Sequence, residues 1–214
     1  MTRWSARKLS ISWASTVVVV ACAIAGRVAV CRAEDQKAED AEVAPDLSTA
    51  RSAALAWIDA CWSGDARAAH KVLVDEERQR EFMTGPLRFS AALRALESAA
   101  VKQFGDAGKR VTGYPDGSAK SIEKQLEIKE EGDRAAASGR EAVLPLQLRR
   151  IDGRWRVDLS GAIGDARARR AAEASGAAAK VAEDMAAEVT AGKFQTADEA
   201  RTVFRERRLA QVKK

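Results

Sequence analysis

Apolar and polar residues alternate along residues 141–160, in two runs joined by Asp152 and Gly153. Side chains two residues apart in a strand point the same way, so the apolar positions of each run share one face. These positions are Ala142, Leu144, Leu146 and Leu148 in the first run and Trp155, Val157 and Leu159 in the second. Asp-Gly supplies the positive φ angles that a two-residue hairpin turn requires. The pattern predicts a β-hairpin with one face covered by another element.

Three stretches before the hairpin have helical periodicity. Residues 50–62 carry a wide apolar arc, which predicts a helix in the concavity of the sheet. Gly64 suits the end of that helix, and Asp65 the start of a second helix over 66–74. We expect Gly85-Pro86 to break the chain, with a third helix after it that Gly105 ends. Its apolar face is predicted to hold Phe89, Leu93, Leu96, Ala100 and Phe104.

Strand periodicity follows this third helix. Ile122, Leu126 and Ile128 alternate with polar residues, and residues 134–138 form a weaker strand after a Gly-Asp turn. A short edge strand over 111–114 is an open alternative. Pro145 has no N–H to donate, so its position is expected at a sheet edge or a bulge. Helices followed by antiparallel strands predict an α+β fold, with the helices packed in a curved, cone-like sheet.

The last part of the chain, residues 161–214, is predicted to form a helical hairpin. One stripe ends at Gly192, and Thr196 with Glu199 forms a capping box that opens the second helix. The positions predicted to face inward are Ala174, Ala178, Val181, Met185, Val189, Ala200, Phe204 and Leu209. Alanine buries little area, so this extension is expected to dock on its own domain or on a partner.

The N-terminus has the pattern of an export signal. Three cations precede an uncharged run from Leu9 to Gly26, and small Cys31 and Ala33 precede a cleavage site. Cleavage after Ala33 predicts a periplasmic or extracellular protein. Two alternatives stay open: a lipoprotein attached at Cys22, and an uncleaved membrane anchor. Residues 34–48 are acidic and poor in large apolar residues, which predicts a disordered tether before a domain over 49–160.

Removal of residues 1–33 changes the charge balance of the protein. The whole chain has a net charge of +5, but the leader holds five of the 36 cations and no acid. The remaining 31 cations balance 31 acids, so net charge gives no argument for nucleic acid binding. Cys61 then remains as the single cysteine, which excludes an internal disulfide and fits a core position on an apolar helical face.

Few residues carry candidate chemistry. His70 is the single histidine and lacks the companions that a metal site or a general base requires. Tyr114 lies in a glycine-rich turn, and the glycines of residues 105–113 follow a helix and lack the spacing of a phosphate-binding loop. We therefore predict no metal and no cofactor.

Two segments resemble a known family. AALAWIDACWSGDARAAHKVL is similar to the opening helix, Gly-Asp turn and second helix of the nuclear transport factor two-like superfamily, and LQLRRIDGRWRVDLS to its last hairpin. The resemblance covers about residues 49–160. It implies a curved sheet around the first helix and a pocket that members use for catalysis, for ligands or for protein contacts. Residues after Ser160 have no counterpart in it.

Four aromatic residues are candidates for lining such a pocket: Trp57, Trp62, Tyr114 and Trp155. The alternative is that the tryptophans fill the core. The expected function is that of an exported non-catalytic domain that binds a protein partner, itself as a homodimer, or a small apolar ligand, or that is structural in the envelope. The second hypothesis is a small isomerase-like or hydrolase-like enzyme that uses Asp59, Asp75 or Asp158 as a pocket acid.

Overall fold

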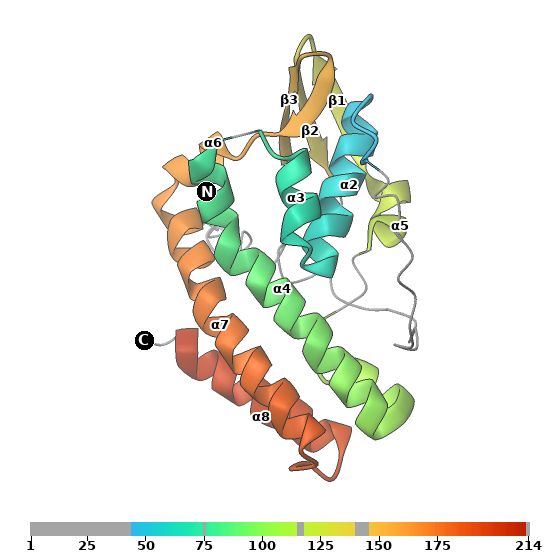
Figure 1. Ribbon diagram of the computed structural model, residues 1–214, viewed down its shortest axis with the longest axis vertical. Coiled ribbons are helices and arrows are strands. Elements are labelled where there is room, and N and C mark those ends of the chain that lie inside the picture. The colour runs from blue at the N-terminus through green and yellow to red at the C-terminus, as the bar shows by residue number, and fades with distance from the viewer. Residues whose placement is uncertain (1–43, 75, 115–117, 140–145, 213–214) are drawn as a thin grey trace, which may run out of the picture.

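The computed structural model describes residues 44–74, 76–114, 118–139 and 146–212. It contains a four-stranded antiparallel sheet in the order β1-β2-β3-β4, and helices pack against that sheet and extend beyond it (Figure 1). The strands are β1 (Glu127–Glu131), β2 (Arg134–Ser138), β3 (Leu146–Ile151) and β4 (Arg154–Val157). The predicted α+β class is therefore confirmed. The predicted leader, most of the tether, Asp75 and the start of the hairpin lie outside the described residues.

The β3–β4 hairpin has the predicted turn. Asp152 and Gly153 have φ angles of 50° and 75°, and Ile151 pairs with Arg154 across the turn. The predicted inward residues Leu148, Trp155 and Val157 are buried, with Trp155 only 1% exposed. Local turn chemistry and period-two patterning thus determine the register of this pair.

Two helices at the start of the described chain pack beside the sheet. Helix α2 (Ala50–Ser63) begins at a capping box of Thr49 with Ser52 and ends at Gly64, whose φ is 71°. Asp65 then caps α3 (Ala66–Val72) by accepting a hydrogen bond from the Ala68 amide at 2.9 Å. Both predicted caps are confirmed. Helix α2 contacts every strand of the sheet.

The predicted break at Gly85-Pro86 is wrong. Helix α4 (Glu77–Phe104) continues through both residues, although Pro86 cannot donate the helical hydrogen bond at its position. Gly85 lies where α4 approaches α7 closely, since a Cβ atom there would lie 2.5 Å from the carbonyl oxygen of Ala172. Packing along the length of α4 outweighs the local signal of the two residues.

The segment after α4 is more helical than predicted. It forms the 3₁₀ helix η2 (Gly105–Arg110), α5 (Ala119–Ile122) and the 3₁₀ helix η3 (Glu123–Gln125), so the strand expected from Ile122 begins only at Glu127. No strand forms over 111–114. Two long-range contacts stabilise these turns: Asp59 accepts from the Ala119 amide at 3.0 Å, and Arg51 donates to the Leu126 carbonyl at 2.8 Å.

The C-terminal extension forms α6 (Ser160–Gly164), α7 (Ala166–Thr190) and α8 (Ala197–Val212). Helix α7 runs beside α4, and α8 folds back against α7 (Figure 1). Thr196 accepts from the Glu199 amide as predicted, while the Glu199 carboxylate accepts from the amide of Gln195, one residue earlier than a capping box requires. Buried Val181, Met185, Val189, Ala200 and Phe204 confirm the central part of the predicted stripe.

Two predicted inward positions in this extension are wrong. Ala174 is exposed and its neighbour Ser175 is buried, and Leu209 is 48% exposed. The inward face at the start of α7 is set by its contact with α4, where Ala171, Ser175 and Ala179 face inward.

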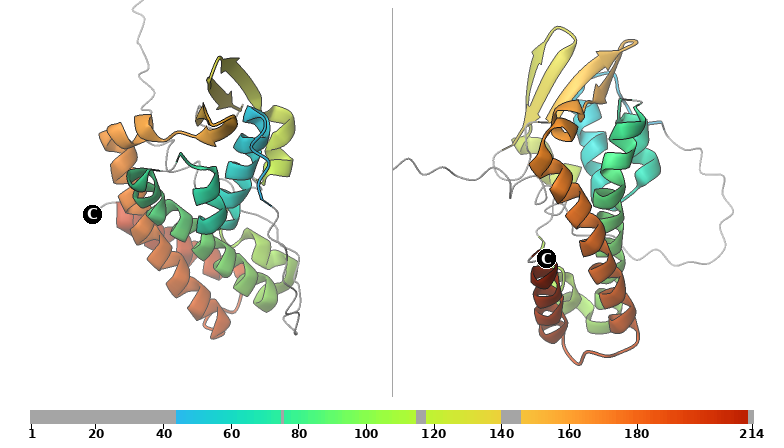
Figure 2. Two further views of the ribbon diagram at one scale, coloured as in Figure 1. Left: turned by 45° about the horizontal axis from the view of Figure 1, so that its top comes forward. Right: turned by 90° about the vertical axis from the view of Figure 1, so that its left-hand side faces the viewer.

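One hydrophobic core includes residues of the sheet, of α2 and α4, and of α7 and α8. The C-terminal extension therefore docks on its own chain. The side view in Figure 2 shows the sheet at one end, with α4, α7 and α8 extending away from it. Leu47 also belongs to this core, because it is 7% exposed and its carbonyl accepts from the Trp155 amide at 2.9 Å. Leu47, which lies within the predicted tether, is thus packed in the core.

Candidate functional site

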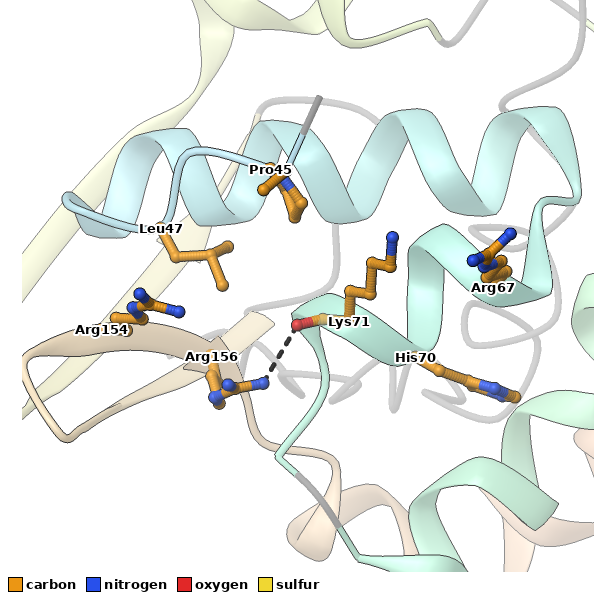
Figure 3. A pocket seen from close by; sticks show the side chains of 8 residues that line it. Pro45, Leu47, Arg67, His70, Lys71, Arg154 and Arg156 are labelled. Carbon is orange, nitrogen blue, oxygen red and sulfur yellow. Dashed lines mark hydrogen bonds between the residues drawn. The ribbon is translucent and has the colours of Figure 1, made fainter. Parts of the chain in front are cut away.

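A hollow of about 700 Å³ lies between the N-terminal segment at Pro45, helix α3 and strand β4 (Figure 3). We name it the basic hollow because of the residues that line it. Its lining consists of Ala44, Pro45, Leu47, Arg67, His70, Lys71, Arg154 and Arg156. Among these residues five carry cationic or imidazole groups and none is acidic, so the lining itself is cationic.

Helix α3 presents three of these side chains together. Arg67, His70 and Lys71 are spaced three and four residues apart, which places them on one side of a helix. Figure 3 shows the side chain of Lys71 extending from α3 to the side on which α2 and the segment at Pro45 lie, while His70 points away from them. The Asp65 cap fixes where the helix starts and hence the direction of this side.

Strand β4 supplies the opposite wall. Arg154 and Arg156 alternate with Trp155 and Val157, so the two arginines share the face of the strand opposite the buried one. Arg156 is fixed in place, because one of its guanidinium nitrogens donates to the carbonyls of Lys71 and Leu73, at 3.0 and 3.2 Å. Arg156 therefore joins β4 to the C-terminal end of α3.

Backbone contacts bring α3 and β4 together. Leu73 forms a parallel β-bridge with Val157, and the Val74 amide donates to the Val157 carbonyl at 2.9 Å. The Leu47 carbonyl contacts the same edge of β4 at Trp155. The geometry of the basic hollow is thus held by main-chain hydrogen bonds together with the guanidinium of Arg156.

His70 has an unsatisfied ring nitrogen. Its Nε2 atom is buried and has no hydrogen-bond partner among the described residues. A buried polar atom without a partner costs about 1–3 kcal/mol, so such atoms in native proteins usually have a ligand or a water. In Figure 3 the imidazole points away from Pro45 and from the ammonium group of Lys71.

The predicted aromatic candidates lie elsewhere. Trp57, Trp62 and Trp155 are at most 7% exposed and belong to the hydrophobic core. Arg150 packs on the ring of Trp155, with 5.0 Å between the guanidinium carbon and the ring centroid. Tyr114 is half-buried against Phe89 and also bonds the guanidinium of Arg208 on α8. The structure brings the tryptophans together in one core and places Tyr114 beside α8.

Two of the predicted pocket acids have structural partners. Asp59 is exposed and caps α5 through the Ala119 amide. Asp158 accepts from fully buried Gln79 at 3.3 Å and from the Ser160 amide at 2.9 Å. Burial alone raises the pKa of Asp158, but these hydrogen bonds and the charge of Arg149 outweigh it and hold the pKa below its usual range. A carboxylate held ionised in this way is a poor general base. Asp75 is outside the described residues.

A second hollow, of about 400 Å³, lies between α4, α6 and α7. Its walls include Arg78, Glu81, Arg169 and Glu173, so cations and acids alternate there. Phe82, Gly85 and Ile163 supply apolar surface. The mixed charges give this hollow no preference for a ligand of one sign.

Other chemistry has little support in the described part of the chain. That part holds no group of three or more His, Cys, Asp or Glu residues with the geometry of a metal site. Burial raises the pKa of the Cys61 thiol, which makes it a poor nucleophile. Across the same residues, every helix is too short or too polar to span a bilayer.

Sequence patterns held part of the signal for the basic hollow. The helix spacing of Arg67, His70 and Lys71 and the strand spacing of Arg154 and Arg156 each predict a cationic face. The sequence does not show that these two faces lie close together, because their proximity depends on the contact of Leu73 with Val157. Comparison of the chain with family models, with curated proteins and with solved structures found no match.

Proposed function

We propose that this protein is an exported, non-catalytic binding domain that holds an acidic segment of a partner protein in the basic hollow. The single observation that carries the proposal is the composition of the hollow: five cationic or imidazole side chains and no acid line it. A wall of one charge sign attracts ligands of the opposite sign and orients them on approach.

An acidic protein segment suits the hollow better than a small apolar ligand does. Apolar ligands favour pockets lined with aromatic and aliphatic side chains, and the three tryptophans of this domain are buried in the core. The apolar part of the lining, Ala44, Pro45 and Leu47, forms one edge of the hollow beside the cations. An extended chain with several carboxylates matches both kinds of surface.

The proposal extends to the fold family. A cone-like domain of the nuclear transport factor two-like kind has its first helix packed inside a curved sheet, and the contact of α2 with all four strands supports that assignment. The long pair α4 and α7 is a feature beyond the resemblance. Export follows from the sequence pattern of residues 1–33.

Binding of a labelled peptide of ten glutamates, followed by fluorescence anisotropy at low and physiological salt, tests the proposal. We expect saturable binding that weakens as salt is added. The double variant Arg67→Gln and Arg154→Gln should bind about five- to tenfold more weakly, because exposed ion pairs contribute about 0.2–1 kcal/mol each and the cations act together.

A matched control removes the same charge elsewhere. Arg134 on β2 and Arg170 on α7 are both exposed and lie outside the lining of the hollow. The variant Arg134→Gln and Arg170→Gln should bind the peptide within about twofold of the unmodified protein. Equal losses in the two double variants would show that only net charge matters and would overturn the proposal.

A further inference from the structure

We propose that the first occupant of the basic hollow is the acidic segment of this same chain, residues 34–43, which competes with acidic segments of other proteins. The inference rests on the proposed function, since it requires that the hollow binds carboxylates. Residues 34–43 would then compete with the partner for the hollow, so that this neighbouring segment would in part set the affinity for the partner.

The composition of the segment matches the hollow. Residues 34–43 contain five acids and one lysine. The acids are Glu34, Asp35, Glu39, Asp40 and Glu42. The segment is also poor in large apolar residues, so burial in a core of its own gains it little free energy.

The position of the segment is the second argument. It ends at Val43, and the next residue, Ala44, is already part of the lining of the hollow. Leu47 fixes the chain there, because it is buried and its carbonyl accepts from the Trp155 amide. The acids are therefore attached to the edge of the site they complement.

The length of the segment suffices for it to reach the hollow. Ten residues span at most about 35 Å when extended, so the carboxylates can meet both the α3 wall and the β4 wall. Attachment through so few residues gives the carboxylates an effective concentration in the millimolar range around the cations. A partner in solution has to compete with this concentration.

The hollow also offers specific partners for carboxylates. Arg154 lies on β4 and Lys71 on α3, so cations lie on both sides of the chain at Pro45 (Figure 3).

The test neutralises the segment in the full chain, kept soluble with mild detergent because of the uncharged run from Leu9 to Gly26. The variant carries Glu34→Gln, Asp35→Asn, Glu39→Gln, Asp40→Asn and Glu42→Gln. The probe is a labelled peptide with the sequence of residues 34–43. We expect the variant to bind the probe about tenfold more tightly than the unmodified chain, because the attached competitor is gone.

A control variant separates local competition from overall charge. Five exposed acids elsewhere are neutralised instead: Glu77, Glu123, Asp133, Asp198 and Glu206. This control should bind the probe within about twofold of the unmodified chain. If the segment variant and the control gain equal affinity, the competition is not local and the inference is wrong.

The outcomes distinguish this inference from the proposed function. If no variant binds the probe or the glutamate peptide, the proposed function fails. If all variants bind the probe equally, the hollow is a binding site without an attached competitor and only the inference fails. Adding Arg67→Gln and Arg154→Gln to the segment variant should abolish the tenfold gain. A gain that depends on protein concentration would assign the competition to a second copy and overturn the inference.

Discussion

The two ends of the molecule are packed by different means. The sheet end, formed by α2, α3 and the four strands, is filled by large side chains, among them Trp57, Trp62 and Trp155. The helical arm, formed by α4, α7 and α8, also buries large side chains such as Phe89 and Phe204, but the buried face of α7 consists largely of small residues such as Ala171, Ala179 and Ala182. Both ends gain stability from buried side-chain volume, and in the arm the small residues of α7 also let two long helices approach closely.

This difference predicts which kind of mutation should destabilise each region. A core of large side chains is sensitive to emptying, because a truncated tryptophan leaves a cavity. A contact between small residues is sensitive to filling, because an added methyl group forces the helices apart. Both regions share one hydrophobic core, so each effect should appear in the same unfolding transition.

The largest effect is expected at the sheet end. Trp155→Ala should lower the free energy of unfolding by about 3–5 kcal/mol, because the side chain is 1% exposed and lies on the inward face of β4. Urea titration measures the loss. Leu209→Ala is the control, since Leu209 is 48% exposed on α8 and its truncation should change stability by less than about 0.5 kcal/mol. A loss below about 1 kcal/mol for Trp155→Ala would contradict burial in the core.

A smaller loss of stability, caused by adding an atom rather than removing a side chain, is expected in the helical arm. Gly85→Ala should destabilise the protein by about 1–3 kcal/mol, because the new Cβ atom would lie 2.5 Å from the Ala172 carbonyl oxygen. Gly176 lies in α7 with nothing within 4 Å of such an atom. Gly176→Ala should therefore stabilise the protein by up to about 1 kcal/mol through helix propensity. Effects of the same sign at the two glycines would refute the close contact of α4 with α7.

The smallest effect concerns Asp158, which joins the end of β4 to the start of α4. Its lowered pKa means that the folded state favours the ionised carboxylate. This contribution is complete above the pKa of the unfolded chain, about 3.9, and is lost as the pH falls through the lower pKa of the folded state. Asp158→Asn should therefore lose stability at pH 7 and decline less steeply with acid than the unmodified protein.

Urea midpoints at pH 7, 4 and 3 measure this change. Glu206→Gln is a suitable control, because Glu206 is an exposed acid on α8. Its midpoints should follow those of the unmodified protein across this range. Parallel acid curves for Asp158→Asn and the unmodified protein would show that the hydrogen bonds from Gln79 and Ser160 do not favour the ionised form.

The hairpin could be predicted from the sequence because its determinants are local. Asp152 and Gly153 set the turn, and the alternation around Leu148 and Trp155 sets the buried face. Helix α4 could not be predicted in the same way. The local signal at Gly85-Pro86 indicates a break, and only the contact with α7, some ninety residues further along the chain, stabilises the helix across it.

The candidate site shows the same limit. Each cationic face is visible in the spacing of its own element, as in Arg67 with Lys71 and in Arg154 with Arg156. Their meeting depends on the bridge of Leu73 to Val157, which no local pattern encodes. The tryptophans were predicted from their spacing to lie at helix and strand core positions, and they do; a pocket lined by them stays a prediction.

The two edges of the sheet differ in how they meet other chains. The outer edge of β4 is covered by Leu47 and Val74, whose backbone groups occupy its hydrogen-bonding positions at Trp155 and Val157. Strand β1 is the other edge, and four of its five residues are charged: Glu127, Lys129, Glu130 and Glu131. Charged side chains on a short edge strand oppose the addition of further strands from neighbouring molecules. Segments of the same chain thus cover one edge of the sheet, and charged side chains protect the other. Both features oppose the addition of strands from other molecules, and hence the growth of fibrillar aggregates at high local concentration.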